Sequence, residues 1–185
     1  SLKLEVNVIT KEDYEAKKAE LEAIRAERQR KLEAERRAAE QKKHREEMQA
    51  MVQSLGLNNA TGNNAIANTA LSLVGLPYVY GGHGPSGFDC SGFVQYVYAQ
   101  NGISISRQIT AQVNSGASVS PENIAPGDII AFSGSYTNNI THVGIYVGND
   151  MFVHAANPRQ GVIVSSLSGW VNIGAGGIVK ITRIA

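Results

Sequence analysis

Charge is spread so unevenly along this chain that its two parts must fold as physically different objects. Between Lys11 and Glu47, 23 of 37 residues are charged, 12 of them basic and 11 acidic. From Gly56 to Ala185 the chain carries only eight charged residues. A helix that is polar on all its faces has no apolar side to bury, whereas the second stretch can fill one core. We therefore expect a solvated helix joined to one globular domain.

Capping and breaking residues set the boundaries of these parts. Thr10 and Asp13 have the spacing of a capping box, and Gly56 is a typical helix stop. The expected parts are an extended leader, a charged helix, a flexible linker and a globular domain, over residues 1–10, 11–55, 56–64 and 65–185. Because the chain begins without methionine, we expect it to be a trimmed piece of a longer protein.

The charged helix is open to two interpretations. An apolar heptad stripe begins at Tyr14 and Leu21, but charged residues occupy most of its continuation until Val52. A strong coiled coil would not place charges there. The helix is therefore either a spacer or weak coiled coil, or a surface that docks a partner protein or a second copy of the chain.

Within the domain, helical patterns come first and strand patterns follow. Helices are predicted over 65–74, 90–101 and 108–114, capped by Asn64, Asp89 and Ser106. Strands are predicted over 129–132, 142–147, 151–154, 162–164 and 178–184, with a tight hairpin turn at "GND". Helices followed by an antiparallel sheet indicate an α+β domain.

Composition excludes several classes of function. Neither part has the one-sign basic surface that binding to a nucleic acid backbone needs. No run of about 18 apolar residues is present, so no membrane insertion is expected. A single cysteine excludes an intrachain disulfide and any site that needs several cysteines. We expect no cofactor.

That single cysteine, Cys90, falls at the first turn of a predicted helix. The helix dipole and the free backbone N–H groups there favour a thiolate and predict a lowered pKa. The same N–H groups can stabilise an oxyanion in an acyl-transfer reaction. Cys90 is therefore either a nucleophile or a small apolar residue at the start of a core helix.

Two histidines are placed to assist a nucleophile. His142 begins one strand of the predicted hairpin and His154 ends the next, so both lie at the end away from the turn. His154 can then reach the His142 imidazole and fix its tautomer, as the third group of a triad does. His83 is expected to line a pocket or to lie in a surface loop, and His44 is expected to be solvated.

A zinc site is the competing chemistry for these residues. One thiolate and two imidazoles, from Cys90, His142 and His154, are a known type of zinc ligand set. The chain lacks the closely spaced ligand pairs that usually form such a site, and we predict no metal.

Five motifs in order resemble the NlpC-type cell-wall peptidases, a bacterial branch of the papain-like cysteine peptidases. These are "YVYGG", "GFDCSGFVQYVY", "APGDIIAF", "HVGIYVG" and "FVHAAN", and the resemblance covers about residues 65–185. It implies a papain-like fold with helices packed on an antiparallel sheet. It also implies Cys90 as nucleophile, His142 as general base and acid, and His154 as the residue that orients His142.

Further roles follow from the same resemblance. Tyr78 is implied to form the oxyanion hole with the Cys90 amide, and Asp89 and Ser91 to line the substrate pocket. The implied reaction is hydrolysis of the bond between γ-linked D-glutamate and a diamino acid, diaminopimelate or lysine, in peptidoglycan stem peptides. Such a substrate implies a secreted or wall-associated protein, bacterial or encoded by a phage.

Two positions depart from the family pattern. Tyr80 stands where the family usually has tryptophan, and "ISISRQITAQ" replaces Leu-Pro-Arg-Thr-Ser. Arg107 in that loop is either a ligand for a substrate carboxylate or a solvated loop residue. Two alternatives to the endopeptidase stay open: an amidase or acyltransferase on the same fold, and a wall-binding module without activity.

Overall fold

The capping box predicted at Thr10 starts the long helix α1 (Lys11–Ser54). The Thr10 hydroxyl accepts a hydrogen bond from the Asp13 backbone N–H at 3.1 Å, and the Thr10 N–H donates to the Asp13 carboxylate at 3.4 Å. The computed structural model describes residues 9–57, 64–134, 137, 139–174 and 176–184. Most of the predicted leader and the middle of the predicted linker fall outside these residues.

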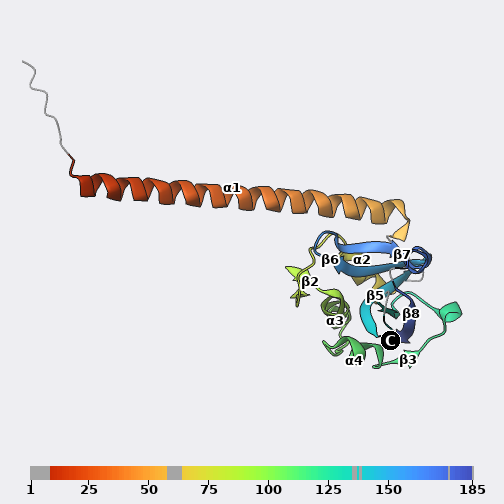
Figure 1. Ribbon diagram of the computed structural model, residues 1–185. Helices are drawn as coiled ribbons and strands as arrows, with labels where there is room; N and C mark the ends of the chain where they lie inside the picture. Colours follow the sequence, from red (N-terminus) through yellow and green to blue (C-terminus); the bar gives the residue numbers. More distant parts are fainter. Residues whose placement is uncertain (1–8, 58–63, 135–136, 138, 175, 185) are drawn as a thin grey trace, which may run out of the picture. The chain divides into compact units, whose positions relative to one another are not determined.

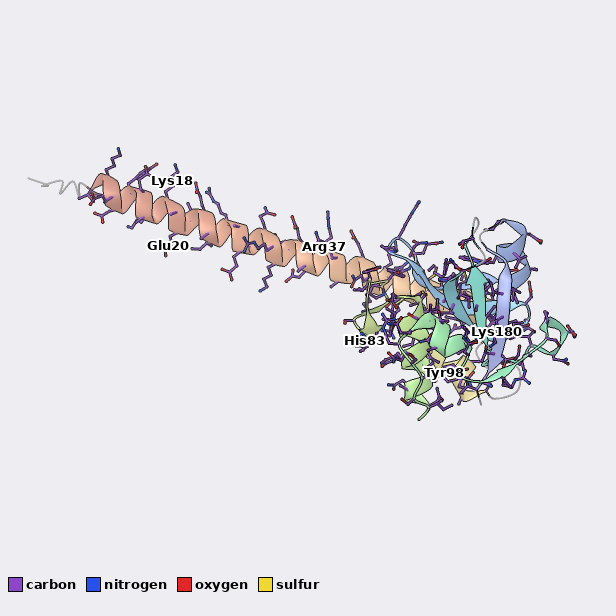
Figure 2. All side chains as sticks on the ribbon, turned by 60° about the horizontal axis from the view of Figure 1, so that its bottom comes forward. Lys18, Glu20, Arg37, His83, Tyr98 and Lys180 are labelled. Carbon is purple, nitrogen blue, oxygen red and sulfur yellow. The ribbon has the colours of Figure 1, made fainter. Side chains whose placement is uncertain are left out.

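The chain divides into two compact units, Ser1–Glu40 and Gln41–Ala185. Every described residue of the first unit is exposed. Figure 2 shows the side chains of α1, Lys18, Glu20 and Arg37 among them, leaving the helix on different sides. Even the apolar side chain of Ile24 is 55% exposed. As expected from the charge pattern, this part of the helix buries no apolar face among the described residues.

The second unit begins inside α1, and the end of that helix belongs to its core. Val52 is 3% exposed and Leu57 is 1% exposed. The Gln49 side-chain amide donates to the Val74 carbonyl at 2.9 Å and to the Leu71 carbonyl at 3.3 Å. These carbonyls close helix α2 (Ala65–Ser72) and the turn after it, so Gln49 acts as a C-terminal cap. Leu57, which was expected in a flexible linker, is instead buried because it completes this apolar contact.

Three of the shorter helices, α2, α3 (Cys90–Gln100) and α4 (Ile109–Val113), lie close to the predicted ranges. A further short helix is α5 (Leu167–Asn172). The Asn64 side chain caps α2 by accepting from Ala67 N–H at 3.0 Å, as predicted. Ser106 is not the cap of α4: the N-cap is Gln108, and its N–H donates to the Ser106 hydroxyl at 3.1 Å. Helix α5 has no counterpart among the predicted elements, because it is only six residues long.

A six-stranded antiparallel sheet has the strand order β3-β8-β4-β5-β6-β7. Its strands are β3 (Ala117–Ser118), β4 (Ile129–Ser133), β5 (Ile140–Gly148), β6 (Met151–Asn157), β7 (Gly161–Ser166) and β8 (Ile178–Arg183). The β5–β6 turn is tight, with φ of +53° at Asn149 and +61° at Asp150. Aspartate and asparagine tolerate this left-handed backbone better than other residues with a side chain.

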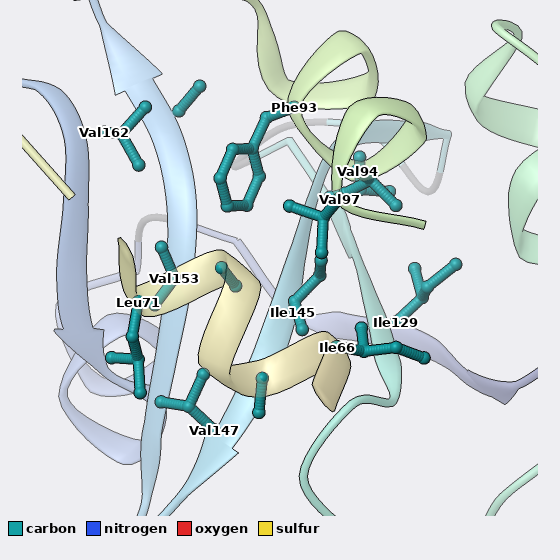
Figure 3. Packing of buried hydrophobic residues seen from close by; sticks show 14 of the residues in the cluster. Ile66, Leu71, Phe93, Val94, Val97, Ile129, Ile145, Val147, Val153 and Val162 are labelled. Atoms are coloured by element: carbon teal, nitrogen blue, oxygen red, sulfur yellow. The ribbon is translucent and has the colours of Figure 1, made fainter. Parts of the chain in front are cut away.

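Each face of the sheet has its own apolar cluster. Helices α2 and α3 pack on one face, where Figure 3 shows Phe93 and Val97 of α3 pointing toward Ile145 and Val153 of the sheet. On the other face Phe132 and Phe152 pack with Leu167 of α5. Helices beside an antiparallel sheet confirm the predicted α+β class (Figure 1). Besides α5, four short elements were not predicted, namely β1 (His83–Gly84), β2 (Gly87–Phe88), β3 and a 3-10 turn (Pro121–Asn123).

Candidate active site

Cys90 is the first residue of α3, and its neighbours fix the start of that helix. The Asp89 carboxylate caps the helix by accepting from the Gly92 N–H at 2.8 Å, as predicted. A Cβ atom at Gly92 would lie 2.0 Å from the Gly82 carbonyl oxygen. Only glycine at position 92 therefore allows the helix start to pack against the glycine-rich turn. The same Asp89 carboxylate accepts from the Gly81 N–H at 3.1 Å, which joins that turn to the helix.

The thiol of Cys90 is held in its neutral form. Burial raises its pKa above the ordinary value, and the Asp89 charge adds to the rise. The backbone N–H groups of Ser91, Val143 and Cys90 itself act in the opposite direction but do not outweigh burial. The lowered pKa expected from the helix start is therefore not found, although the helix amides do act in the expected sense. The influence of the Val143 N–H also places the thiol close to β5, at the residue that follows His142.

This resting state predicts how fast the thiol is alkylated at different pH values. Because iodoacetamide reacts with the thiolate, the rate at Cys90 should rise about tenfold per pH unit from pH 6 to above the ordinary cysteine pKa. Mass spectrometry of the intact protein gives the rate without ambiguity, since Cys90 is the only cysteine. In urea, the midpoint of this pH dependence should fall to the ordinary pKa of a cysteine thiol. A rate that is flat between pH 5 and 7 would instead reveal a preformed thiolate–imidazolium pair.

The two histidines of the β5–β6 hairpin are in direct contact. His142 Nε2 and His154 Nδ1 lie 2.7 Å apart, and the two rings meet edge to face at 4.9 Å. His154 is fully buried, and its Nε2 lies 2.9 Å from the Ser165 hydroxyl. The hairpin geometry expected from the sequence thus brings the two imidazoles together. Ser165 is an addition that the sequence analysis missed.

One set of tautomers allows His142 to accept a proton on Nδ1. His142 then carries its proton on Nε2 and donates it to His154 Nδ1, and His154 donates from Nε2 to the Ser165 hydroxyl. In that arrangement the remaining nitrogen, His142 Nδ1, is an acceptor. The chain of three side chains therefore suits a general base that is oriented from behind.

Burial keeps both imidazoles neutral. The pKa of His142 falls from 6.5 to about 4 because its ring is removed from water. Burial likewise lowers the pKa of His154 well below its usual range, and the neighbouring His142 lowers it further. Together with the raised pKa of Cys90, this gives a neutral thiol and two neutral imidazoles across the physiological range.

Tyr78 reaches the same site through a short stretch of backbone pairing. The Phe88 N–H donates to the Pro77 carbonyl at 3.1 Å, and the Val79 N–H donates to the Phe88 carbonyl at 2.9 Å. This pairing places Tyr78 beside the residues that lead into Cys90. Burial raises the pKa of the Tyr78 phenol, and Coulombic effects of Cys90, once it ionises, and of the Asp89 carboxylate raise it further. The phenol therefore stays a neutral hydrogen-bond donor near the thiol.

Arg107 is paired rather than solvated. Its guanidinium donates to the Asp89 carboxylate and to the Ser91 hydroxyl, each at 2.5 Å. The Arg107 side chain is 33% exposed and that of Asp89 is 15% exposed. The three predicted pocket residues thus form one cluster at the start of α3. Arg107 reaches it although the loop that carries it departs from the family pattern.

A buried glutamine holds this cluster in place through hydrogen bonds to the backbone. Gln112 of α4 is fully buried, and its amide nitrogen donates to the Ser91 and Ser106 carbonyls, both at 2.8 Å. It therefore ties the start of α3 to the loop before Arg107. The sequence analysis missed Gln112, because a single glutamine in a five-residue helix carries no periodic signal.

Among the described residues, neither remaining histidine is hydrogen-bonded to this arrangement. His83 is exposed in β1, where its Nδ1 lies 3.3 Å from the Gly81 carbonyl oxygen. His44, which was expected to be solvated, is partly buried on the part of α1 that belongs to the second unit.

No group of three or more His, Cys, Asp or Glu side chains suited to a metal ion occurs among the described residues. In the same residues, no helix combines the length and the apolar character needed to cross a membrane.

Comparisons with known proteins point to one family. The family model described as "NlpC/P60 family" matches residues 75–172. The chain is 44% identical over 111 residues to "Gamma-DL-glutamyl hydrolase" of Bacillus subtilis (strain 168), covering 59% of the chain and 27% of that protein. It is 44% identical over 99 residues to "Probable endopeptidase p60" of Listeria seeligeri, covering 52% of the chain and 18% of that protein. The chain thus spans about a quarter or less of these relatives.

Solved structures agree with the sequence comparisons. The NlpC/p60 domain of the peptidoglycan hydrolase SagA is 34% identical, with a TM-score of 0.55, and the match covers 64% of this chain and 96% of that one. NlpC2 from Trichomonas vaginalis is 32% identical, with a TM-score of 0.59, and the match covers 67% and 48% of the two chains. The helices and sheet of the second unit therefore have the papain-like arrangement of these domains.

Proposed function

The chain belongs to the NlpC/P60 family, and from this membership we propose that it is a cysteine endopeptidase acting on peptidoglycan stem peptides. The observation that carries the proposal is the hydrogen bond between His142 and His154, together with a thiol at a helix start that lies close to the N–H of Val143, the next residue of β5. The proposed bond joins γ-linked D-glutamate to the following diamino acid, diaminopimelate or lysine. The similarity to a protein named gamma-DL-glutamyl hydrolase supports this choice of bond.

In the proposed reaction, proton transfer accompanies nucleophilic attack. The Cys90 sulfur attacks the substrate carbonyl carbon while His142 Nδ1 takes the thiol proton, so that no free thiolate is needed at rest. The Tyr78 hydroxyl and the Cys90 backbone N–H stabilise the oxyanion that forms. His142 then gives its proton to the departing amine. Water, activated by the same imidazole, finally hydrolyses the thioester.

Asp89, Ser91 and Arg107 are the proposed substrate contacts. Their cluster presents a carboxylate, a hydroxyl and a guanidinium beside the nucleophile. Paired charges of this kind can bind both the ammonium and the carboxylate groups of a stem peptide. Because Asp89 also caps α3, a change at this position would disturb both substrate binding and the start of the helix.

The products of digestion test this proposal directly. Incubation with purified muropeptides, followed by mass spectrometry, should yield fragments with a new D-glutamate carboxyl end. Parallel digests of peptides that differ only in diaminopimelate or lysine show which diamino acid is preferred. A freed lactyl group would instead indicate an amidase. No cleavage of either substrate, with binding retained, would indicate a wall-binding module.

Localisation and partners follow from the substrate. Because peptidoglycan lies outside the cytoplasmic membrane, we propose that the protein acts as a secreted or wall-associated enzyme. The exposed, charged part of α1, residues 11–40, is proposed to serve as a spacer or to bind a partner protein or a second copy.

A further inference from the structure

The only tryptophan of the chain lies on the histidine pair. Trp170 of α5 stacks on the His142 ring, with centroids 5.6 Å apart and planes at 22°. Its edge-to-face contact with the His154 ring is 4.8 Å, also between centroids. The indole further contacts Phe152 at 5.7 Å and Phe132 at 5.9 Å. One side chain thus covers both members of the hydrogen-bonded pair and joins them to the apolar cluster of that sheet face.

The helix that carries Trp170 is anchored to the same hairpin that carries the histidines. The Asp150 carboxylate accepts from the Ser166 hydroxyl at 2.8 Å and from the Ser168 N–H at 3.1 Å. The Asp150 carbonyl accepts from the Leu167 N–H at 2.6 Å. The turn between β5 and β6 therefore fixes α5 at its first residues. A rigid connection links the strands that bear the histidines to the ring that covers them.

Covering the pair matters because water competes for its hydrogen bond. The bond between His142 Nε2 and His154 Nδ1 orients the His142 ring only while both nitrogens are kept from water. Stacking also holds the plane of the His142 ring, which a single hydrogen bond leaves free to rotate. Neither effect requires contact between the indole and a substrate.

We propose that Trp170 is a positioning residue of the active site, which excludes water from the His142–His154 pair and holds the His142 ring in place. The catalytic part of this inference rests on the proposed function, whereas its effect on the histidines does not. The titratable group in contact with His142 is His154 from β6, and Cys90, with Asp89 beside it, approaches β5 at the neighbouring Val143. Strand β4 and helix α5 contribute no ionisable side chain. Burial is therefore the main control on the protonation of His142, in line with its lowered pKa.

The test follows the histidines themselves in the full chain. Nitrogen NMR of the imidazole rings, assigned with His142→Gln and His154→Gln, should give a His142 pKa of about 4 in the unchanged protein. Trp170→Ala should raise this pKa by about one unit or more toward the ordinary value, because water enters. Trp170→Phe, which keeps an aromatic face, should raise it less. The pH at which kcat/KM falls on the acid side should rise in the same order, more for Trp170→Ala than for Trp170→Phe.

Controls separate positioning from general damage and from failure of the proposed function. Ile173→Ala removes a side chain that is 78% exposed at the end of the same helix, and should leave the His142 pKa unchanged. If Trp170→Ala does not fold, Trp170→Phe and Trp170→Leu provide the comparison. An unchanged His142 pKa in every folded Trp170 variant would overturn the inference. A shifted pKa in a protein without hydrolytic activity would support the inference and reject the enzyme.

Discussion

Replacing Cys90 with alanine is expected to abolish hydrolysis of muropeptides while leaving the fold intact. The thiol is the only proposed nucleophile, and loss of a nucleophile lowers turnover by at least about ten-thousandfold. The change removes one sulfur atom at the start of α3, where the Asp89 cap and the packing of Gly92 do not depend on it. Turnover measured by chromatography and melting followed by circular dichroism test the two halves of this expectation.

Two further variants make the Cys90 result interpretable. Ser86→Ala changes an exposed residue in the nearby turn and should leave turnover and melting unchanged. Cys90→Ser replaces the thiol with a hydroxyl and should be nearly inactive. A hydroxyl is a weaker nucleophile than a thiol, and the site around it is formed for a sulfur atom. Substantial hydrolysis by a folded Cys90→Ala protein would reject the cysteine mechanism. It would leave the assignment to the family untouched.

Removing residues 1–63 is expected to destabilise the protein strongly, whereas removing residues 1–40 should not. The longer deletion strips away Val52 and Leu57, both buried, and the Gln49 cap of α2. Loss of two buried apolar side chains costs about 4 kcal/mol or more, which lowers the melting temperature by roughly 10 °C. Both deletions keep Asn64, so the N-terminal cap of α2 is the same in each. Calorimetry gives the two melting temperatures.

Point variants in the full chain provide a matched control for the deletions. Leu57→Ala should lower the free energy of unfolding by about 2–5 kcal/mol. Leu32→Ala changes the same residue type where the side chain is 51% exposed, and should have little effect. Equal melting temperatures for the two deletions would show that the domain begins near residue 65, as the sequence predicts. A large difference would move that boundary into α1.

Local signals were enough to predict the parts of the site that depend on neighbours in sequence. The Asp89 cap of α3 could be predicted because a short side chain with an acceptor oxygen comes just before an apolar helical pattern. The meeting of His142 and His154 followed from strand periodicity and a tight turn between the two strands. Both inferences need only the backbone geometry of one element or of one hairpin. The catalytic roles of these residues stay predictions.

What the sequence did not reveal depends on contacts between distant segments. Trp170 and Gln112 lie on helices too short to show a periodic pattern, and their partners come from other elements. The contact of Ser165 with His154 could have been predicted from the strand register. The β6–β7 register pairs Ser165 with Phe152, which makes Ser165 a diagonal neighbour of His154. Leu57 was misassigned because its neighbours are typical of a linker, while its own side chain packs into the core.

The pKa of Cys90 shows why local reasoning also failed on electrostatics. The helix start does lower that pKa, but burial by the surrounding segments raises it more, and burial is a property of the whole fold. The sign of the shift is therefore decided by two competing effects. Only one of them can be read from the position of a residue in its helix.

A thiol that is held in its neutral form is also protected from oxidation. Peroxides attack the thiolate and convert it to sulfenic acid, and further oxidation is irreversible. Because Cys90 is partly buried and its pKa is raised, the resting protein offers oxidants little thiolate to attack. The chain holds no second cysteine that could form a disulfide with it, so burial and the raised pKa are what shield this sulfur within the chain.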